Sequence, residues 1–93
     1  MENQAEFYQK LRKSLVETTT FPTTYSYKFI VPNKELVINQ LMELFNFQGA
    51  VITSKDSKTK KYRSFTIYVL TNSVDDIIQK YVEASAIEGI ISL

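Results

Sequence analysis

The residue types that carry most enzyme chemistry are missing from this chain. Its 93 residues include no histidine and no cysteine. Histidine is the side chain that most often acts as a general base near neutral pH, and cysteine is the strongest common nucleophile. Both also supply the usual ligands of transition metals. We therefore expect a protein that is not an enzyme and that uses no metal and no other cofactor.

Two adjacent carboxylates, Asp75 and Asp76, come closest to a paired acidic site. Such a pair can act as general acid and base, or bind a divalent cation. Both residues also follow Ser73 in a Ser-x-x-Asp pattern that is typical of a helix N-terminus. Negative charge at that end of a helix complements its dipole. Since no third ligand or base lies nearby in the sequence, the pattern favours a helix cap over a reactive site.

Glycine, the residue of phosphate-binding loops, occurs only twice, as Gly49 and Gly89. A loop that cradles phosphate needs clustered glycines in front of a helix. Both glycines instead come after segments that we predict to be helical. This position is typical of a helix C-terminus, where glycine adopts the left-handed conformation easily.

Positive charge is concentrated in one short segment, although the net charge of the chain is only +1. The segment contains one anion, Asp56, and five cations: Lys55, Lys58, Lys60, Lys61 and Arg63. The rest of the chain has six cations and nine anions. One hypothesis is a finger that binds an anion, RNA or a partner protein. The other is a solvated hairpin whose lysines keep a sheet edge soluble.

Hydrophobic periodicity predicts the elements that hold these residues. Apolar residues at helical spacing predict three helices. The first covers about residues 3–17, the second runs from the N-cap Asn33 to Gly49, and the third begins after Ser73. Strand patterns predict strands at 24–31, 62–70 and 90–93, and the start of a further strand at 50–53. A polar connector at 54–61 follows that start. The expected buried stripes of the second and third helices are Leu36, Val37, Leu41, Leu44 and Phe45, and Val74, Ile77, Ile78, Tyr81 and Val82.

The order of these elements predicts an α+β fold of the ferredoxin-like kind. After the first helix the order is βαββαβ, which folds as a four-stranded antiparallel sheet, order 4-1-3-2, with two helices on one face. We divide the chain into an N-terminal helix and linker at 1–20 and a ferredoxin-like domain at 21–93. Strand alternation turns one apolar set toward the helices: Tyr25, Tyr27, Phe29, Val31, Phe65, Ile67 and Val69.

The opposite face of the sheet has no predicted helix over it. Its residues are Ser26, Lys28, Ile30, Tyr62, Ser64, Thr66 and Tyr68. Tyrosine is favoured at protein interfaces, so this face is a candidate binding surface. The alternatives are a partly wet face, or one that the N-terminal helix covers. An RNA-binding strand of the RRM type is disfavoured, because alternation turns Phe65 inward and the motif's glycines are missing.

From Phe21 onward the chain resembles the YbeD-like family of small bacterial proteins of unknown function. The matching residues are Phe21-Pro22-Thr23, Tyr27-Lys28, Ser54-Lys55, the run from Lys61 to Ile67, and Tyr81. The resemblance implies a ferredoxin-like fold similar to the ACT regulatory domains that bind amino acids. Those domains carry glycine in the turn between first strand and first helix. Here the turn at 31–34 has none, which makes close approach of a ligand to the backbone harder.

We expect a small cytoplasmic, non-enzymatic regulatory or interaction module. The first 15 residues hold five charges and no continuous apolar run, so they predict neither a signal peptide nor a membrane span. The expected partner is a protein, with self-association through the sheet face or N-terminal helix as an option. Alternatives are binding of RNA or another polyanion, and an ACT-like small-ligand sensor. The candidate binding surface comprises Lys55, Lys58, Lys60, Lys61, Arg63, Lys28, Tyr62 and Tyr68.

Overall fold

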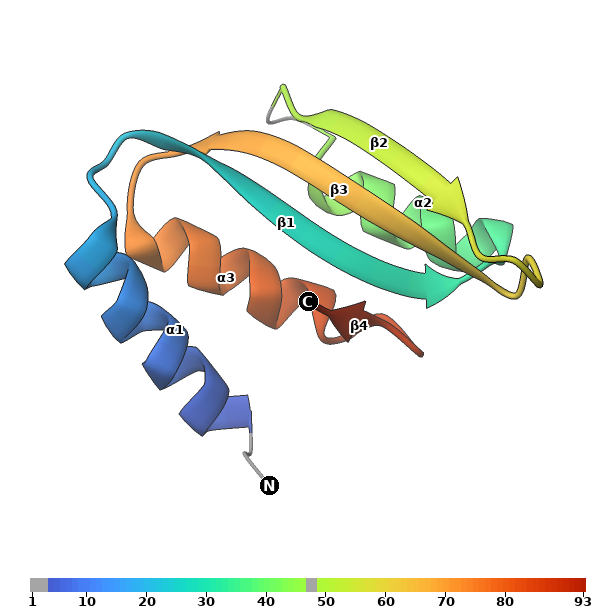
Figure 1. Ribbon diagram of the computed structural model, residues 1–93, viewed down its shortest axis with the longest axis horizontal. Coiled ribbons are helices and arrows are strands. Elements are labelled where there is room, and N and C mark those ends of the chain that lie inside the picture. Colours follow the sequence, from blue (N-terminus) through green and yellow to red (C-terminus); the bar gives the residue numbers. More distant parts are fainter. Residues whose placement is uncertain (1–3, 47–48) are drawn as a thin grey trace.

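A computed structural model describes residues 4–46 and 49–93 (Figure 1). Its elements are α1 (Gln4–Thr18), β1 (Thr23–Pro32), α2 (Glu35–Leu44), β2 (Val51–Asp56), β3 (Tyr62–Thr71), α3 (Val74–Ala84) and β4 (Ile91–Ser92). The strands form one antiparallel sheet in the order β2-β3-β1-β4. This is the predicted order 4-1-3-2 counted from the other edge, so the predicted α+β plait is confirmed.

The two central strands, β1 and β3, pair along their full length. Tyr27 lies opposite Ile67, and Phe29 lies opposite Phe65. Beside them, β2 runs to Asp56, three residues beyond the strand start that we predicted at 50–53. The extension is polar but pairs with β3, and an edge strand accepts charged residues because they discourage aggregation. On the other edge, β4 pairs with β1 through only two residues.

Helix α1 lies against α3 and does not cover the open face of the sheet (Figure 1). The hydroxyl of Tyr8 donates to the carbonyl of Tyr81 at 3.4 Å, and Arg12 forms an ion pair with Asp75. The aromatic rings of Phe7 and Tyr81 meet edge to face at 6.1 Å. These contacts exclude the alternative in which the N-terminal helix covers the open face.

The helix boundaries confirm one predicted cap and correct another. Ser73 caps α3, accepting a hydrogen bond from the Asp76 backbone N–H at 3.2 Å. Asn33 does not cap α2, because Lys34 takes the N-cap position without a side-chain bond. The Asn33 amide instead donates to Asp56 at 3.2 Å and to the Lys60 carbonyl at 3.0 Å. The N-cap prediction for Asn33 was therefore wrong.

Neither glycine caps a helix directly, contrary to our prediction. The C-caps are Phe45 for α2 and Ser85 for α3, so both helices end several residues before Gly49 and Gly89. At the end of α2, the Phe45 N–H donates to the Met42 carbonyl, which tightens the last turn and closes the helix early. Both glycines have positive φ, +62° and +78°, in the loops that lead into β2 and β4.

Two residues of the predicted helix stripes are exposed. Leu36 of α2 is 73% exposed and Val82 of α3 is 41% exposed. Leu36 precedes the buried Leu41 by five positions, and Val82 follows the buried Ile77 by five. Five residues correspond to about 140° around the helix axis. Each side chain is therefore turned away from that buried residue of its own helix.

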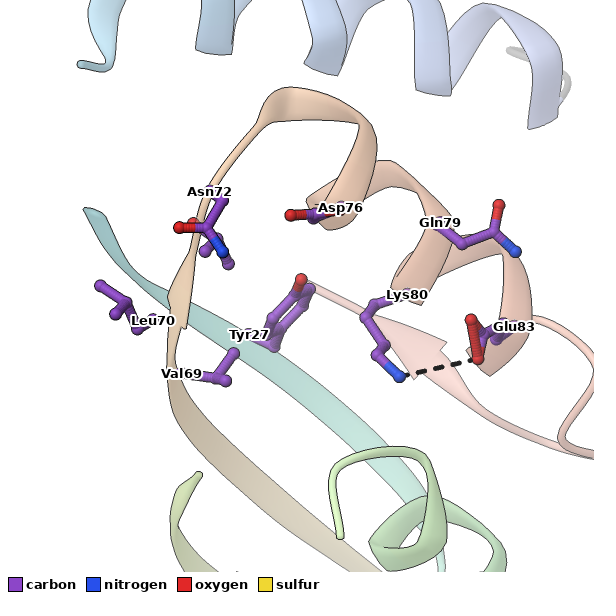
Figure 2. A pocket seen from close by; sticks show the side chains of 9 residues that line it. Tyr27, Val69, Leu70, Asn72, Asp76, Gln79, Lys80 and Glu83 are labelled. Carbon is purple, nitrogen blue, oxygen red and sulfur yellow. Dashed lines mark ion pairs between the residues drawn. The ribbon is translucent and has the colours of Figure 1, made fainter. Parts of the chain in front are cut away.

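Helix α3 has two different sides. One side buries Ile77, Ile78 and Tyr81 toward α1 and the sheet. Along the other side, Asp76, Gln79, Lys80 and Glu83 border a pocket beside the end of β3 (Figure 2). The position of α3 over the sheet therefore shapes this pocket as well as the core.

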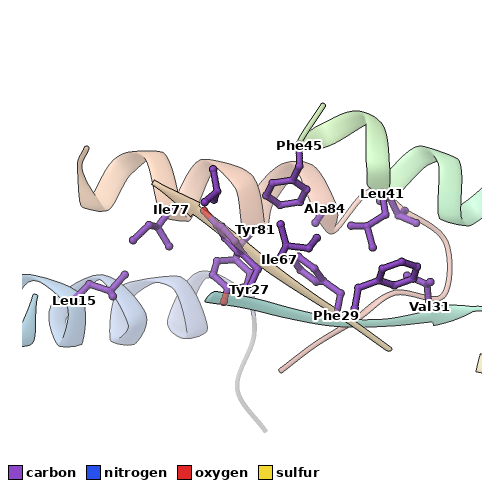
Figure 3. Close-up of a cluster of buried hydrophobic side chains, with 13 residues drawn as sticks. Leu15, Tyr27, Phe29, Val31, Leu41, Phe45, Ile67, Ile77, Tyr81 and Ala84 are labelled. Atoms are coloured by element: carbon purple, nitrogen blue, oxygen red, sulfur yellow. The ribbon is translucent and has the colours of Figure 1, made fainter. Parts of the chain in front are cut away.

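The core lies between the sheet and the helices α2 and α3, and its centre is aromatic (Figure 3). The ring of Tyr27 stacks on Phe29 at 5.9 Å and approaches Phe45 and Tyr81 at 5.2 Å each. Aliphatic residues surround these rings: Val31, Leu41, Ile67 and Ile77. Phe65 is buried on the same side, so the predicted strand alternation is confirmed. Burial of large aromatic rings supplies much of the stability of so small a domain.

Candidate functional site

Four of the predicted site residues share the open face of the sheet. Lys28 pairs with Thr66, Lys55 with Ser64, and Tyr68 with Ser26. Directly opposed residues of antiparallel strands point to the same side, and Tyr62 has the parity of Tyr68. No helix in the described part of the chain lies over this side (Figure 1). Lys28, Tyr62 and Tyr68 therefore share the face on which strand alternation predicted them, and the register adds Lys55, which we predicted to lie in the polar connector at 54–61.

Three further apolar residues belong to this surface, and sequence reasoning missed them. Val51 and Leu70 are each 62% exposed, and Ile91 is 49% exposed. Leu70 has the same parity as Tyr68, so strand alternation alone would have found it. Val51 pairs with Tyr68 and Ile91 with Ile30, so their positions depend on the register of two short edge strands. No signal in the sequence fixes that register.

The apolar residues form two groups at opposite ends of the open face. Val51, Tyr68 and Leu70 lie at one end, and Ile30, Tyr62 and Ile91 lie at the other, as the pairing shows. Tyr62 and Tyr68 are six residues apart on β3, which corresponds to roughly 20 Å. Neighbouring nucleic-acid bases stacked on aromatic rings need a much closer spacing. The two tyrosines therefore do not make the adjacent stacking platform of an RRM sheet.

One apolar group borders a shallow hollow of about 130 Å³. Ile30 and Tyr62 line it together with Lys55, Asp56, Ser57 and Ser64, and its exposed lining is mostly apolar. A hollow of this size suits a single apolar side chain from a partner. Anchoring side chains that fill small pockets contribute most of the energy at protein interfaces.

The open face is positively charged. Its strand positions hold Lys28 and Lys55, and none of the corresponding positions of β1, β2, β3 and β4 holds an aspartate or glutamate. Asp56 reaches the rim of the hollow, but it pairs with Arg63 at 3.6 Å and accepts from the Asn33 amide. The charge presented beside the apolar groups is therefore cationic.

The predicted basic segment is divided among three places. Lys55 is on the open face, whereas Arg63 has the parity of the buried Phe65 and lies on the helix side. There the Arg63 Nε donates to Ser54 at 3.0 Å, and its guanidinium lies 5.8 Å from the Phe65 ring centre. Arg63 thus bonds within its own sheet and does not extend the cationic surface.

The other three lysines, Lys58, Lys60 and Lys61, lie in the turn between β2 and β3. The turn is closed by a hydrogen bond from the Lys60 N–H to the Ser57 carbonyl at 3.0 Å. Lys60 has a φ of +61°, in the region that favours glycine. The exposed lysine side chains form a second, separate cationic patch.

The turn at 31–34, where ACT domains carry glycine, is hydrogen-bonded to the segment between β2 and β3. The Asn33 backbone N–H donates to the Lys61 carbonyl at 2.9 Å, and the Asn33 side chain bonds Asp56 and Lys60. A Cβ atom on Gly89 would lie 2.7 Å from the Pro32 ring, so the loop before β4 is close to this turn. The predicted obstacle to ligand binding at 31–34 is consistent with this arrangement.

The carboxylates Asp75 and Asp76 open α3, as predicted, and their side chains have different surroundings. Asp75 pairs with Arg12 of α1, whereas Asp76 borders the pocket beside β3. Within residues 4–46 and 49–93, no three acidic side chains come close enough together to hold a metal ion. Nor does the described part of the chain contain a helix long and apolar enough to cross a membrane.

The fold and this surface define a ferredoxin-like α+β domain with an uncovered, apolar and cationic sheet face. A model of the family described as "Protein of unknown function (DUF493)" matches residues 16–93, and the chain therefore belongs to this family, the YbeD-like family. The match begins at Val16, so it takes in the end of α1. No curated protein matches the chain, and no solved structure does.

Proposed function

We propose that this protein is a non-enzymatic interaction module whose open sheet face binds a protein surface that is both acidic and apolar. The observation that carries the proposal is the composition of the face. Of the large hydrophobic residues that are exposed in the described chain, five belong to it: Val51, Tyr62, Tyr68, Leu70 and Ile91. They form the two groups at opposite ends of the face, and groups of exposed apolar residues mark interaction sites.

The charges of the face select the partner. Lys28 and Lys55 stand between and beside the apolar groups, with no acidic residue at the neighbouring strand positions. A second copy of this chain, docked face to face, would place the lysines of both copies in one interface with no aspartate or glutamate from the strand positions of the face, and like charges in an interface cost free energy. A partner with carboxylates between apolar side chains would instead satisfy both features. One of those apolar side chains would occupy the hollow beside Tyr62.

Nucleic acid fits this face less well than a protein does. The tyrosines are too far apart for consecutive bases, and β1 presents no aromatic ring on this side. The lysines of the turn form a separate patch and offer charge without a stacking surface. Catalysis is not part of the proposal, because the chain supplies neither histidine nor cysteine. The cytoplasmic location also stays a prediction.

Carbodiimide cross-linking in cells of the native source tests the proposal, since this reagent joins lysine amines directly to carboxylates. We expect Lys28 and Lys55 to be cross-linked to aspartate or glutamate in an apolar segment of one partner protein. The double variant Tyr62→Ser, Tyr68→Ser should lose this partner. The matched control is Leu36→Ser, Val82→Ser, which removes two exposed apolar side chains from the helix side and should retain it.

Three results would contradict the proposal. The first is cross-links that join Lys28 or Lys55 to a second copy of the chain. The second is a partner that the tyrosine variant retains as well as the control does. The third is capture of nucleic acid that disappears after nuclease treatment and takes the bound proteins with it.

A further inference from the structure

A second hollow lies between α3 and the end of β3, and Leu70 is the residue of the open-face groups that also lines it (Figure 2). It has a volume of about 320 Å³, at the lower end of the range for small-molecule sites. Its lining includes residues with polar or charged groups: Tyr27, Asn72, Asp76, Gln79, Lys80 and Glu83. These residues come from β1, α3 and the loop before α3, so the fold brings together groups that are distant in sequence.

The Tyr27 hydroxyl is the most informative of these groups. The residue is completely buried, and its hydroxyl is the one buried side-chain oxygen or nitrogen of the described residues that has no hydrogen-bond partner. Figure 2 shows this hydroxyl pointing between β3 and α3, on the side where Asp76 lies. The hydroxyls of Tyr8, Tyr25 and Tyr81 all have partners. A buried polar group without a partner is rare and calls for an explanation.

The Tyr27 hydroxyl is a donor at neutral pH. Burial raises the pKa of Tyr27, and the nearby Tyr25, Asp76 and Glu83 raise it further. The hydroxyl therefore keeps its proton and can give it to an acceptor oxygen. The structure leaves that donor unused.

Only some of the charged side chains around the hollow have partners within the chain. Lys80 is engaged, because its Nζ donates to the Leu44 carbonyl at 2.6 Å and lies 3.7 Å from the Glu83 carboxylate. Asp76 has no ion-pair partner among the described residues, whereas its neighbour Asp75 pairs with Arg12. One negative charge is thus left over at the hollow, on the Asp76 carboxylate. The N-terminus of α3 offsets part of this charge, and the remainder favours a cationic ligand.

We propose that this hollow binds a small polar organic cation, a primary amine that also carries an oxygen atom. The ammonium group pairs with the Asp76 carboxylate, and the oxygen accepts a hydrogen bond from the Tyr27 hydroxyl. The amides of Asn72 and Gln79 line the hollow on either side of these two groups (Figure 2). The site differs from the 31–34 turn of ACT domains and shares no lysine with the open face.

Amide NMR titration with 4-amino-1-butanol tests the site, and 1,4-butanediol is the uncharged control probe. We expect the amine to shift amide signals of residues 69–83 in a saturable way, and the diol to bind at least about tenfold more weakly, since a charge-assisted bond is lost. Asp76→Asn should weaken amine binding by about tenfold. Asp75→Asn is the matched control because it removes the adjacent carboxylate, and it should leave the affinity unchanged.

Tyr27→Phe tests the second contact. We expect it to weaken amine binding by roughly threefold to tenfold, as for one lost hydrogen bond. The melting temperature of the free variant should stay the same or rise, because the hydroxyl has no partner to lose. Equal binding of amine and diol, equal effects of Asp75→Asn and Asp76→Asn, or signals that shift only outside residues 69–83 would each overturn the proposal. A lower melting temperature of free Tyr27→Phe would show that the hydroxyl already has a partner, and would overturn its role.

Discussion

The hydroxyl oxygens of Tyr25 and Tyr81 lie 2.9 Å apart and join the first strand to the third helix. The backbone carbonyl of Tyr81 also accepts a hydrogen bond from Tyr8, so α1 is attached at the same residue. Tyr81 is buried, and its ring contacts those of Phe7, Tyr27 and Phe29. Tyr81 therefore links α1, β1 and α3, and its hydrogen bond with Tyr25 requires that at least one of the two hydroxyls keeps its proton.

This arrangement predicts that the protein loses stability at alkaline pH. Burial raises the pKa of Tyr81, and the hydrogen bond with Tyr25 raises it further. Burial likewise raises the pKa of Tyr27. Unfolded tyrosines release their protons near pH 10. The stabilisation is thus fully present below about pH 10 and declines above it, because the unfolded chain then binds fewer protons than the folded chain.

Urea unfolding between about pH 8 and about pH 11 measures this loss. Each of the two tyrosines should contribute up to about 1.4 kcal/mol per pH unit above pH 10. Tyr81→Phe should unfold at lower urea concentration near neutral pH but show a shallower alkaline slope, since one of the two groups is removed. The difference between the alkaline slopes of the wild type and of Tyr81→Phe is the decisive quantity. Equal slopes would contradict the prediction.

Phe65→Ala should cost about 3–5 kcal/mol of the free energy of unfolding, because it empties a large buried site opposite Phe29. Tyr68→Ala, three residues later on the open face, should cost no more than about 1 kcal/mol. Chemical unfolding of both variants provides the measurement. If both variants lose a similar free energy of unfolding, the open face is covered in solution. That result would favour self-association over the proposed protein partner.

The two glycines should differ in how well they tolerate alanine. At Gly49, φ is +62° and a Cβ atom would meet nothing within 4 Å, so Gly49→Ala should cost only about 1 kcal/mol of backbone strain. At Gly89, φ is +78° and the Cβ would lie 2.7 Å from the Pro32 ring. Gly89→Ala should therefore cost about 2–4 kcal/mol, from strain and steric overlap together.

A second substitution separates strain from overlap at Gly89. Pro32→Ala removes the ring atoms that the new Cβ would touch, so the double variant should be less destabilised than the sum of the two single variants. Thermal unfolding of the four proteins gives the coupling energy. Additive effects would show that Gly89 and Pro32 are not in close contact.

Sequence patterns predicted the sheet more completely than the helix ends. Alternation along β1 and β3 identified every inward residue from Tyr25 to Val31 and from Phe65 to Val69, because a half-buried strand has a period of two. The helix ends depend on weaker local forces. Asn33 has the chemistry of an N-cap, but its side-chain nitrogen donates to Asp56 and to the Lys60 carbonyl, which orients the side chain toward the β2–β3 turn, and those partners are distant in sequence.

Only part of the candidate site could be predicted, because the rest also depends on contacts between residues that are distant in sequence. Tyr62 and Tyr68 follow from alternation within one strand, whereas Val51 and Ile91 enter the surface through the pairing of short edge strands. The hollow beside α3 had no signal at all. Tyr27 has the pattern of an ordinary core residue, and only the packing of α3 over β3 shows that its hydroxyl lacks a partner.

The final prediction concerns which lysines contact the partner. Lys28 and Lys55 stand on the open face, and Lys58 and Lys60 stand in the turn at its end. One double variant is Lys28→Gln with Lys55→Gln, and the other is Lys58→Gln with Lys60→Gln. Both remove two positive charges from exposed positions, so they are matched in net charge.

If an acidic, apolar protein binds the open face, the Lys28 and Lys55 variant should weaken binding to the cross-linked partner by about fivefold to tenfold and flatten its salt dependence. The second variant should change both quantities far less, because long-range attraction is screened within about 10 Å at moderate salt. Titrations of the purified partner at low and moderate salt give the affinities. A larger loss in the turn variant would locate binding on the basic turn and would favour a polyanion as the ligand.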